Sequence, residues 1–155
     1  MIDVRDKTKI DAAALQSLVE GATRELRKLY RPKHAPVPRP PGGDTMIVAV
    51  EDRRLVGAVE YLIGDDEVLV QGLAVHPDHR RRGLARALIT RIEGIARERG
   101  KVRLTLRTIW ETGNARVFQR LGFETIGEYR SHRFESPTGG AVVEVVMERP
   151  LPPAW

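Results

Sequence analysis

The sequence of 155 residues predicts one α/β domain, in which helices pack on a mixed and mostly antiparallel sheet. Three observations lead to this fold class. Strand-like segments follow one another closely in the middle of the chain, which is typical of an antiparallel meander. A helix between two further strands then gives one parallel crossover. The length suits a single hydrophobic core, so residues 1–149 are assigned to one domain.

The first part of the chain predicts a strand, a helix and a long loop. Val4 begins the strand, and Thr8 with Asp11 three residues later resembles a capping box that opens the helix. Five prolines and two glycines then predict an extended loop over residues 31–43. The apolar residues of the helix recur at helical spacing and form one face: Leu15, Leu18, Val19, Ala22, Leu26, Leu29 and Tyr30.

The remaining elements follow from alternation and from helical spacing. Strands are predicted over residues 45–51, 55–63 and 68–75, with a hairpin turn at residues 64–67. A helix follows Pro77 and ends before Gly100, and a half-buried strand covers residues 102–107. A short helix over 112–121 and strands over 123–134 and 141–148 complete the domain. The tail over 150–155 is expected to fray, and its Trp155 is a candidate for docking on a second copy in a homodimer.

Composition narrows the class of protein. No apolar run is long enough to span a bilayer, and Met1–Val4 lacks the cationic start of a signal peptide, so we expect a cytoplasmic protein with no membrane partner. The chain has no cysteine, which excludes disulfides, a thiolate nucleophile and a cysteine zinc site, and we expect no metal. The net charge of +5 favours an anionic partner. Aromatic residues make up only 5%, which argues against a nucleic-acid platform.

The densest basic run stands where a phosphate group is commonly bound. Residues 75–85 place a strand end, a turn, the run His79–Arg82 and a glycine directly before a helix. The first N–H groups of a helix have no internal partner and lie at its positive end, so they bind phosphate readily. Neither G-x-G-x-x-G nor a G-K-[ST] loop is present. Taken alone, the arginine run has a second interpretation as a solvated helix face.

The pattern Arg80-x-x-Gly83-x-Ala85 resembles the pyrophosphate-binding signature of the GNAT superfamily of acyl-CoA N-acyltransferases. The segments 73–77 and 120–123 also match that superfamily, so the resemblance covers residues 45–123. It implies acetyl-CoA as cofactor and transfer of the acetyl group to a small-molecule or peptide amine in a ternary complex. The alternative function is a non-catalytic acyl-CoA-binding regulatory module.

The resemblance also implies a set of cofactor residues and a break in the sheet. The central parallel strand pair is expected to splay at a bulge, with helices on both faces of the sheet. Gly72 suits the bulge, although it is equally consistent with a close packing contact. The loop over 31–43 is expected to border the acceptor site. The implied cofactor residues are Leu73, Ala74 and Val75 for the pantetheine arm, Arg80, Arg81, Arg82, Gly83, Leu84, Ala85 and Arg86 for the pyrophosphate, and Asn114 with Phe118 nearby.

The sequence departs from the superfamily pattern at the usual catalytic positions. The tyrosine that often protonates the departing thiolate is replaced by Phe118, and the glutamate that often serves as base is replaced by Gln71. The asparagine that often precedes the tyrosine is Glu111, with Asn114 one helical turn later. Asn114 is as consistent with a cap or an exposed site as with a cofactor contact, and Phe118 suits the core whatever the function.

Hairpin geometry offers a substitute for the missing base. If the turn is centred between Asp65 and Asp66, Glu60 lies opposite Gln71 and points to the same face of the sheet. Glu60 is therefore the candidate catalytic base, acting through a water. The alternatives are an exposed strand glutamate, or a register slipped by one residue that puts Tyr61 in this place.

Overall fold

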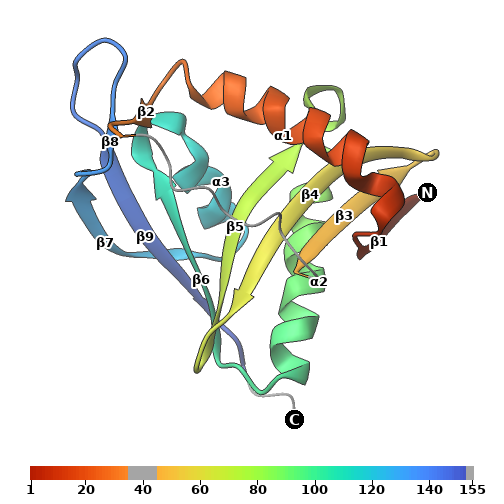
Figure 1. Ribbon diagram of the computed structural model, residues 1–155. Coiled ribbons are helices and arrows are strands. Elements are labelled where there is room, and N and C mark those ends of the chain that lie inside the picture. Colours follow the sequence, from red (N-terminus) through yellow and green to blue (C-terminus); the bar gives the residue numbers. More distant parts are fainter. Residues whose placement is uncertain (35–44, 153–155) are drawn as a thin grey trace.

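The computed structural model describes residues 1–34 and 45–152 and contains a seven-stranded sheet in the order β1-β3-β4-β5-β6-β9-β7 (Figure 1). Only β5 and β6 are parallel, which confirms the predicted mixed and mostly antiparallel sheet. The strands of the sheet are β1 (Ile2–Asp6), β3 (Met46–Glu51), β4 (Arg54–Ile63), β5 (Glu67–Val75), β6 (Arg103–Ile109), β7 (Glu124–Arg130) and β9 (Val143–Pro150). The helices are α1 (Ala12–Leu26), α2 (Leu84–Glu98) and α3 (Asn114–Arg120), and β2 (Arg31–Pro32) pairs with β8 (Phe134–Glu135) outside the main sheet.

The predicted capping box opens the first helix. The buried Asp11 carboxylate accepts a hydrogen bond from the Thr8 N–H at 2.8 Å, after which one 3-10 turn leads into α1. The guanidinium of Arg5 donates to both oxygens of Asp11 at 2.8 and 3.0 Å. This bond lowers the pKa of Asp11 to about 2. The start of α1 is therefore fixed to β1 by a charged bond as well as by the cap.

The sequence prediction overextended the first helix and the strand that was predicted over residues 123–134. The first helix ends at Leu26 and does not continue to Tyr30, because the chain turns at residues 27–29 before Arg31–Pro32 pairs with β8. Arg31–Pro32 is a short strand, so the prediction of a loop over 31–43 is wrong for these two residues. The loop from residue 35 onward lies outside the described residues. The strand predicted over 123–134 is interrupted after β7, where the Ser131 hydroxyl accepts the N–H groups of residues 133 and 134.

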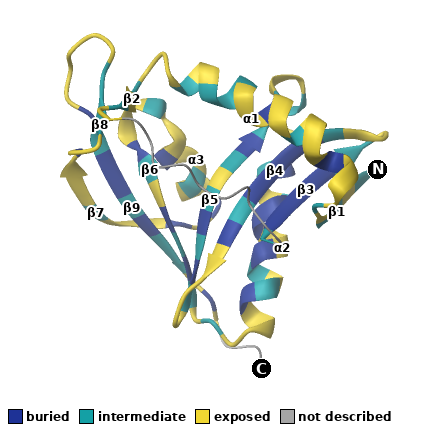
Figure 2. Cartoon of the chain, in the orientation of Figure 1, coloured by how far each residue is buried: buried dark blue, intermediate teal, exposed yellow. Residues whose placement is uncertain are grey.

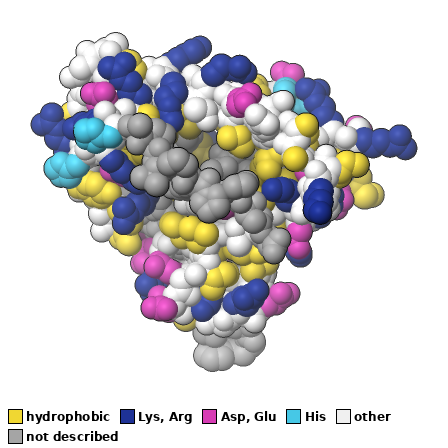
Figure 3. All heavy atoms as spheres, viewed as in Figure 1, with side chains coloured by type: hydrophobic (Ala, Val, Ile, Leu, Met, Phe, Trp, Pro, Cys, Tyr) yellow, Lys and Arg dark blue, Asp and Glu magenta, His cyan; other side chains and the backbone are white. Residues whose placement is uncertain are grey.

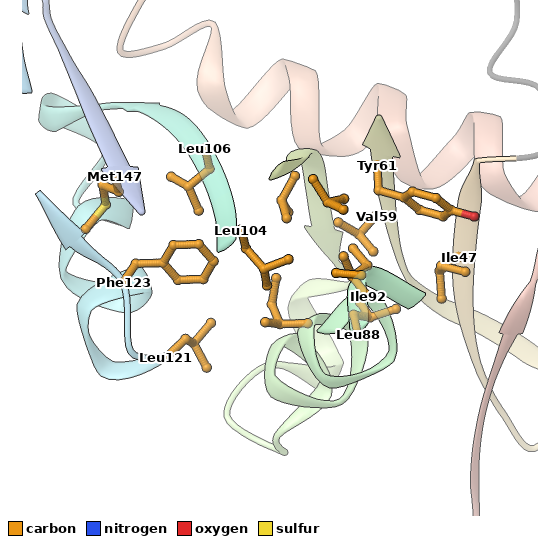
Figure 4. Packing of buried hydrophobic residues seen from close by; sticks show 14 of the residues in the cluster. Ile47, Val59, Tyr61, Leu88, Ile92, Leu104, Leu106, Leu121, Phe123 and Met147 are labelled. Carbon is orange, nitrogen blue, oxygen red and sulfur yellow. The ribbon is translucent and has the colours of Figure 1, made fainter. Parts of the chain in front are cut away.

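Helices cover both faces of the sheet and bury two separate cores (Figure 2). Leu18 of α1 packs with Ala58 and Ala74 on one face. The larger core lies on the other face under α2 and α3. Figure 4 shows Leu104 between the side chains around α2 and those around α3, so the larger core is continuous from β3 to β9.

β5 carries a bulge in its pairing with β4, and its pairing with β6 ends early. Ala58 pairs with Ala74 and Glu60 with Gln71, so two residues of β5 face one residue of β4. Gly72 adopts φ +64°, and a Cβ built on it would meet no atom within 4 Å, which favours the bulge over a packing contact. The parallel pairing of β5 with β6 covers only residues 67–69 of β5 and ends at Leu69. Beyond it the two strands diverge, as Figure 1 shows, and the predicted splay is confirmed.

The last strand runs further than predicted. Pro150 still belongs to β9, and Leu151 is buried with its N–H donating to the Val102 carbonyl at 2.8 Å. The expected fraying is therefore wrong for these two residues, because they close the edge of the core beneath β6. Trp155, the candidate docking residue, lies outside the described residues. Within residues 1–34 and 45–152, no helix is both long enough and apolar enough to cross a membrane.

Replacing Gly72 by alanine is expected to lower the free energy of unfolding by about 1–2 kcal/mol, because a side chain strains a left-handed backbone. Gly94→Ala is the matched control. Gly94 lies in α2 with equally open space around its Cβ, and alanine there should raise the free energy of unfolding by about 0.5–1 kcal/mol. Urea unfolding of the three proteins measures both effects. Stabilisation by both substitutions would contradict a special conformation at Gly72.

Candidate active site

A cleft of about 1320 Å³ opens where β5 and β6 separate. Its lining includes Leu26 and Tyr30 from the α1 side of the sheet and Asn114 and Phe118 from the α3 side. The cleft therefore passes through the gap between the two strands and is reached from both faces. Two ligands that approach from opposite faces can meet inside it.

Glu60 and Gln71 face each other at the start of this gap. The predicted register is confirmed, and the Gln71 side-chain nitrogen donates to Glu60 Oε1 at 2.6 Å. Both side chains are half-buried and line the cleft. Tyr61 points to the opposite face and is buried in the larger core, so the slipped register that placed it beside Gln71 is wrong. The bond from Gln71 holds Oε1 of Glu60 in place and does not involve Oε2.

The start of α2 lies just beyond the end of β5. After the 3-10 turn Pro77–His79, Arg81 and Gly83 both have positive φ, and Gly83 is the N-cap of the helix. Glycine has no side chain to cap the first N–H groups, and a Cβ on Gly83 would meet no atom within 4 Å. Leu84 is buried and anchors the first turn. These open donors and this open space fit a phosphate group.

The arginines of this segment do not all face open space. Arg80 donates to both oxygens of Glu25 on α1, at 3.0 and 2.8 Å, and its Nε lies 3.4 Å from the Val75 carbonyl oxygen. The bond to Glu25 raises the pKa of Arg80 and lowers the pKa of Glu25. Arg82 lies 3.5 Å from Glu51. The segment is therefore held to α1 and to the end of β3 by ion pairs.

The predicted cofactor residues fall into two groups. Leu73, Asn114 and Phe118 line the cleft, and the Phe118 ring packs edge-on against Phe123 with centroids 5.8 Å apart. Ala74 is buried under α1. The second group, Val75 and residues 80–86, lies outside the cleft lining, at the end of β5 and the start of α2. The start of α2 therefore lies outside the cleft, beyond the end of β5.

The cleft also contains a buried carboxylate that the sequence did not single out. Glu144 of β9 is 2% exposed, and its oxygens accept hydrogen bonds from Arg133 at 2.6 and 3.0 Å and from Ser131 at 2.9 Å. Burial raises the pKa of Glu144, but the bonds from Arg133 and Ser131 outweigh burial and leave this pKa below its ordinary value. No sequence motif links these residues. They meet because β7, which Ser131 and Arg133 follow, pairs with β9, which carries Glu144.

An aromatic contact closes one end of the cleft. Tyr30 and Phe134 pack edge-on with centroids 5.1 Å apart, and the Arg133 guanidinium lies 4.8 Å from the Phe134 ring centroid. Burial raises the pKa of Tyr30. Arg31 pairs with Glu135 beside this contact, both through the backbone and by an ion pair of 3.3 Å. The end of α1 is therefore joined to the hairpin before β9.

The fold is shared with acetyltransferases of known structure. The chain is similar over its full length to the ribosomal-protein-S18-alanine N-acetyltransferase from Escherichia coli, covering 97% of that chain at 18% identity and a TM-score of 0.74. It is similar over its full length to yncA from Salmonella typhimurium, whose structure holds its cofactor acetyl-CoA, covering 96% of that chain at 20% identity and a TM-score of 0.75. A GCN5-related N-acetyltransferase from Kribbella flavida aligns with 97% of this chain and 98% of its own, at 24% identity and a TM-score of 0.73.

Sequence comparison identifies the family. The model of the acetyltransferase (GNAT) family matches residues 14–123, which is more than half of the chain. The protein therefore belongs to the GNAT acetyltransferase family, and the predicted resemblance is confirmed. The matched segment includes the bulge in β5, the start of α2 and the whole of α3. No curated protein matches the chain in sequence.

Arg133→Gln is expected to lower the free energy of unfolding by about 1–3 kcal/mol at pH 7, because it leaves the Glu144 charge buried without its guanidinium. The deficit should shrink as the pH is lowered to about 4, since burial alone raises the pKa of Glu144 and protonation then removes the charge. Arg31→Gln breaks an exposed pair and serves as the control, with an expected loss of at most about 1 kcal/mol. Denaturant unfolding at both pH values measures these effects, and a deficit that is independent of pH would contradict the role given to Glu144.

Proposed function

We propose that the protein transfers an acetyl group from acetyl-CoA to a primary amine by direct attack in a ternary complex. The observation that carries this proposal is that two features lie on one strand. β5 leaves β6 beyond Leu69, and the uncapped start of α2 follows the far end of β5. A cofactor with its phosphate groups at α2 reaches the cleft by running along the free edge of β5.

We assign the parts of the cofactor to the predicted residues described above. The N–H groups of residues 81–86 receive the pyrophosphate, where Gly83 leaves room for close approach. The backbone of Leu73, Ala74 and Val75 pairs with the pantetheine arm as an added strand would. The long bond of 3.4 Å from Arg80 to the Val75 carbonyl gives way to this pairing. Asn114 and Phe118 border the arm from the α3 side.

We propose that Glu60 accepts the proton of the attacking amine through a water. It is the carboxylate nearest to the place of the usual base, and Gln71 holds its Oε1 at 2.6 Å. When bound, acetyl-CoA supplies the thioester carbonyl that the amine attacks, and CoA leaves as the thiolate. Backbone N–H groups at the bulge stabilise the charge that develops on the carbonyl oxygen. Phe118 has no proton to give, so positioning of the two reactants contributes much of the rate.

A non-catalytic acyl-CoA-binding module is the second candidate, and Gln71 and Phe118 at the usual catalytic positions favour it. A thiol-release assay with acetyl-CoA across a panel of amines separates the two functions. Amine-dependent release of CoA supports the enzyme. Tight binding of acetyl-CoA with no release for any amine supports the module. Acetyltransferases that share this fold are named for unlike acceptors, including a ribosomal-protein alanine and nourseothricin, so the panel must be broad.

Gly83→Asp is expected to weaken acetyl-CoA binding by at least about 2 kcal/mol, or about 30-fold, because it places a carboxylate beside the pyrophosphate. Gly83→Asn is the matched control, since asparagine has nearly the same shape, tolerates a positive φ and carries no charge. It should lose much less affinity than the aspartate variant. Isothermal calorimetry measures both. Wild-type affinity in a folded Gly83→Asp protein would overturn the placement of the pyrophosphate.

Glu60→Gln is expected to lower kcat by about 100-fold or more and to remove the acidic limb of the pH–rate profile, because the base is lost. Glu67→Gln is the control. Glu67 also lines the cleft, but it pairs with Arg103 at its closed end. Its substitution should leave the pH–rate profile as in the wild type. Wild-type turnover in Glu60→Gln would remove Glu60 from the mechanism and leave bulk water, or the acceptor itself, as the proton sink.

A further inference from the structure

Most of the charged side chains that line the cleft are paired with one another. The Arg103 guanidinium lies 3.8 Å from Glu67 and 3.9 Å from Glu148, at the end where β5 and β6 are still paired. Arg133 and Glu144 form the second pair, at 2.6 Å. Arg133 and Glu144 cancel, but Arg103 also donates to both oxygens of Asp66 at 3.1 Å and so faces three carboxylates. The closed end of the cleft therefore keeps an excess of negative charge.

Two charged side chains of the lining, Glu60 and Arg107, form no ion pair within the described part of the chain. Glu60 bonds only to the neutral amide of Gln71. Arg107 of β6 forms no ion pair, and its one contact is Nη1 to the Tyr129 hydroxyl, at 3.4 Å. Its partner across the ladder on β9 is Val146, which is apolar and offers no counter-charge. Along the gap itself, the cleft therefore presents the negative charge of Glu60 and the positive charge of Arg107.

These two charges lie on opposite walls of the gap. The last parallel pair is Leu69 with Thr105, and two residues further along each strand are Gln71 and Arg107. Glu60 bonds to Gln71 on the β5 wall, while Arg107 stands on the β6 wall. All of these side chains line the cleft on the face of the sheet that α1 covers. A ligand that spans the mouth of the gap meets both charges.

We propose that Arg107 binds an acidic group of the acceptor, so that the acceptor is a small amine that also carries an anion, with a free amino acid as the simplest case. This inference rests on the proposed acetyl transfer and names its substrate class. The guanidinium presents a fork of donors that matches a carboxylate, and the Tyr129 hydroxyl adjoins it as a further donor. The amine of the same molecule is attracted towards Glu60. An amine with one acidic group matches the charges of Glu60 and Arg107 in sign.

The surface around the cleft favours a small anion over a polyanion. On the face seen in Figure 3, Lys and Arg side chains are spread among Asp and Glu side chains and do not gather into one basic patch. Nucleic acid binding requires many cations along one surface. Arg107 is an exposed residue of the cleft lining and offers a single guanidinium, which binds a single acidic group. Its attraction strengthens when the ligand displaces water.

The test compares each common amino acid as the free acid and as its carboxamide, which keeps the shape and removes the charge. The wild-type protein should acetylate at least one free acid with a kcat/KM about 10-fold to 100-fold above that of its amide. Arg107→Gln should bring this ratio close to one, and Arg107→Lys should restore part of it. Arg130→Gln is the control, because Arg130 is exposed like Arg107 but does not line the cleft. It should keep the wild-type ratio.

A ratio near one in the wild type, or an Arg107→Gln loss that is equal for acid and amide, overturns the proposal. If no amine is acetylated, the same pairs are titrated into the CoA-loaded protein and binding is measured by calorimetry. A preference for the acid that Arg107→Gln abolishes then supports the anion site and overturns only the catalytic function. Equal binding of acid and amide overturns the anion site as well.

Discussion

The ladder between β5 and β6 stops after Leu69, and most features of the site depend on this break. Each strand keeps its other neighbour, because β5 still pairs with β4 and β6 pairs with β9 along its whole length. The backbone groups along the gap are therefore left for a ligand or water. Beneath the gap the larger core stays continuous through Leu104, as Figure 4 shows. The sheet can open at one end because its core is not divided.

The α1 helix connects the two ends of the proposed ligand path. Its Glu25 binds Arg80 beside the start of α2, while the chain just after it carries Tyr30 to the contact with Phe134. The two ends of this proposed path are thus attached to α1 itself, through Glu25, and to the chain just after it, through Tyr30. A shift of α1 would therefore disturb the contacts at both ends. The exposed Arg80–Glu25 pair adds only modest stability by itself.

The sequence predicted those parts that local patterns determine. The opposition of Glu60 and Gln71 follows from a short turn, and the helix that begins at Leu84 follows from apolar residues at helical spacing. The bulge at Gly72 was implied by the family resemblance, since a glycine in a strand is equally consistent with a packing contact. Contacts between distant segments were missed, because no local pattern encodes them. Arg31 meets Glu135 across 104 positions of sequence, and the chain leaves the helical path after Leu26, before it reaches this pairing. Arg107 reads as an ordinary alternating strand residue until the gap is known.

The bulge also reverses which side of β5 a residue faces. Before it, Val70 packs into the larger core and Gln71 faces the cleft on the α1 side, but after it Ala74 packs under α1 while Leu73 packs against the larger core. Without the extra residue, Gln71 and Leu73 would share a face. Two positions only two residues apart therefore belong to different faces. A substitution at Gln71 therefore changes the face of the sheet under α1, whereas a substitution at Leu73 changes the opposite face of the same strand.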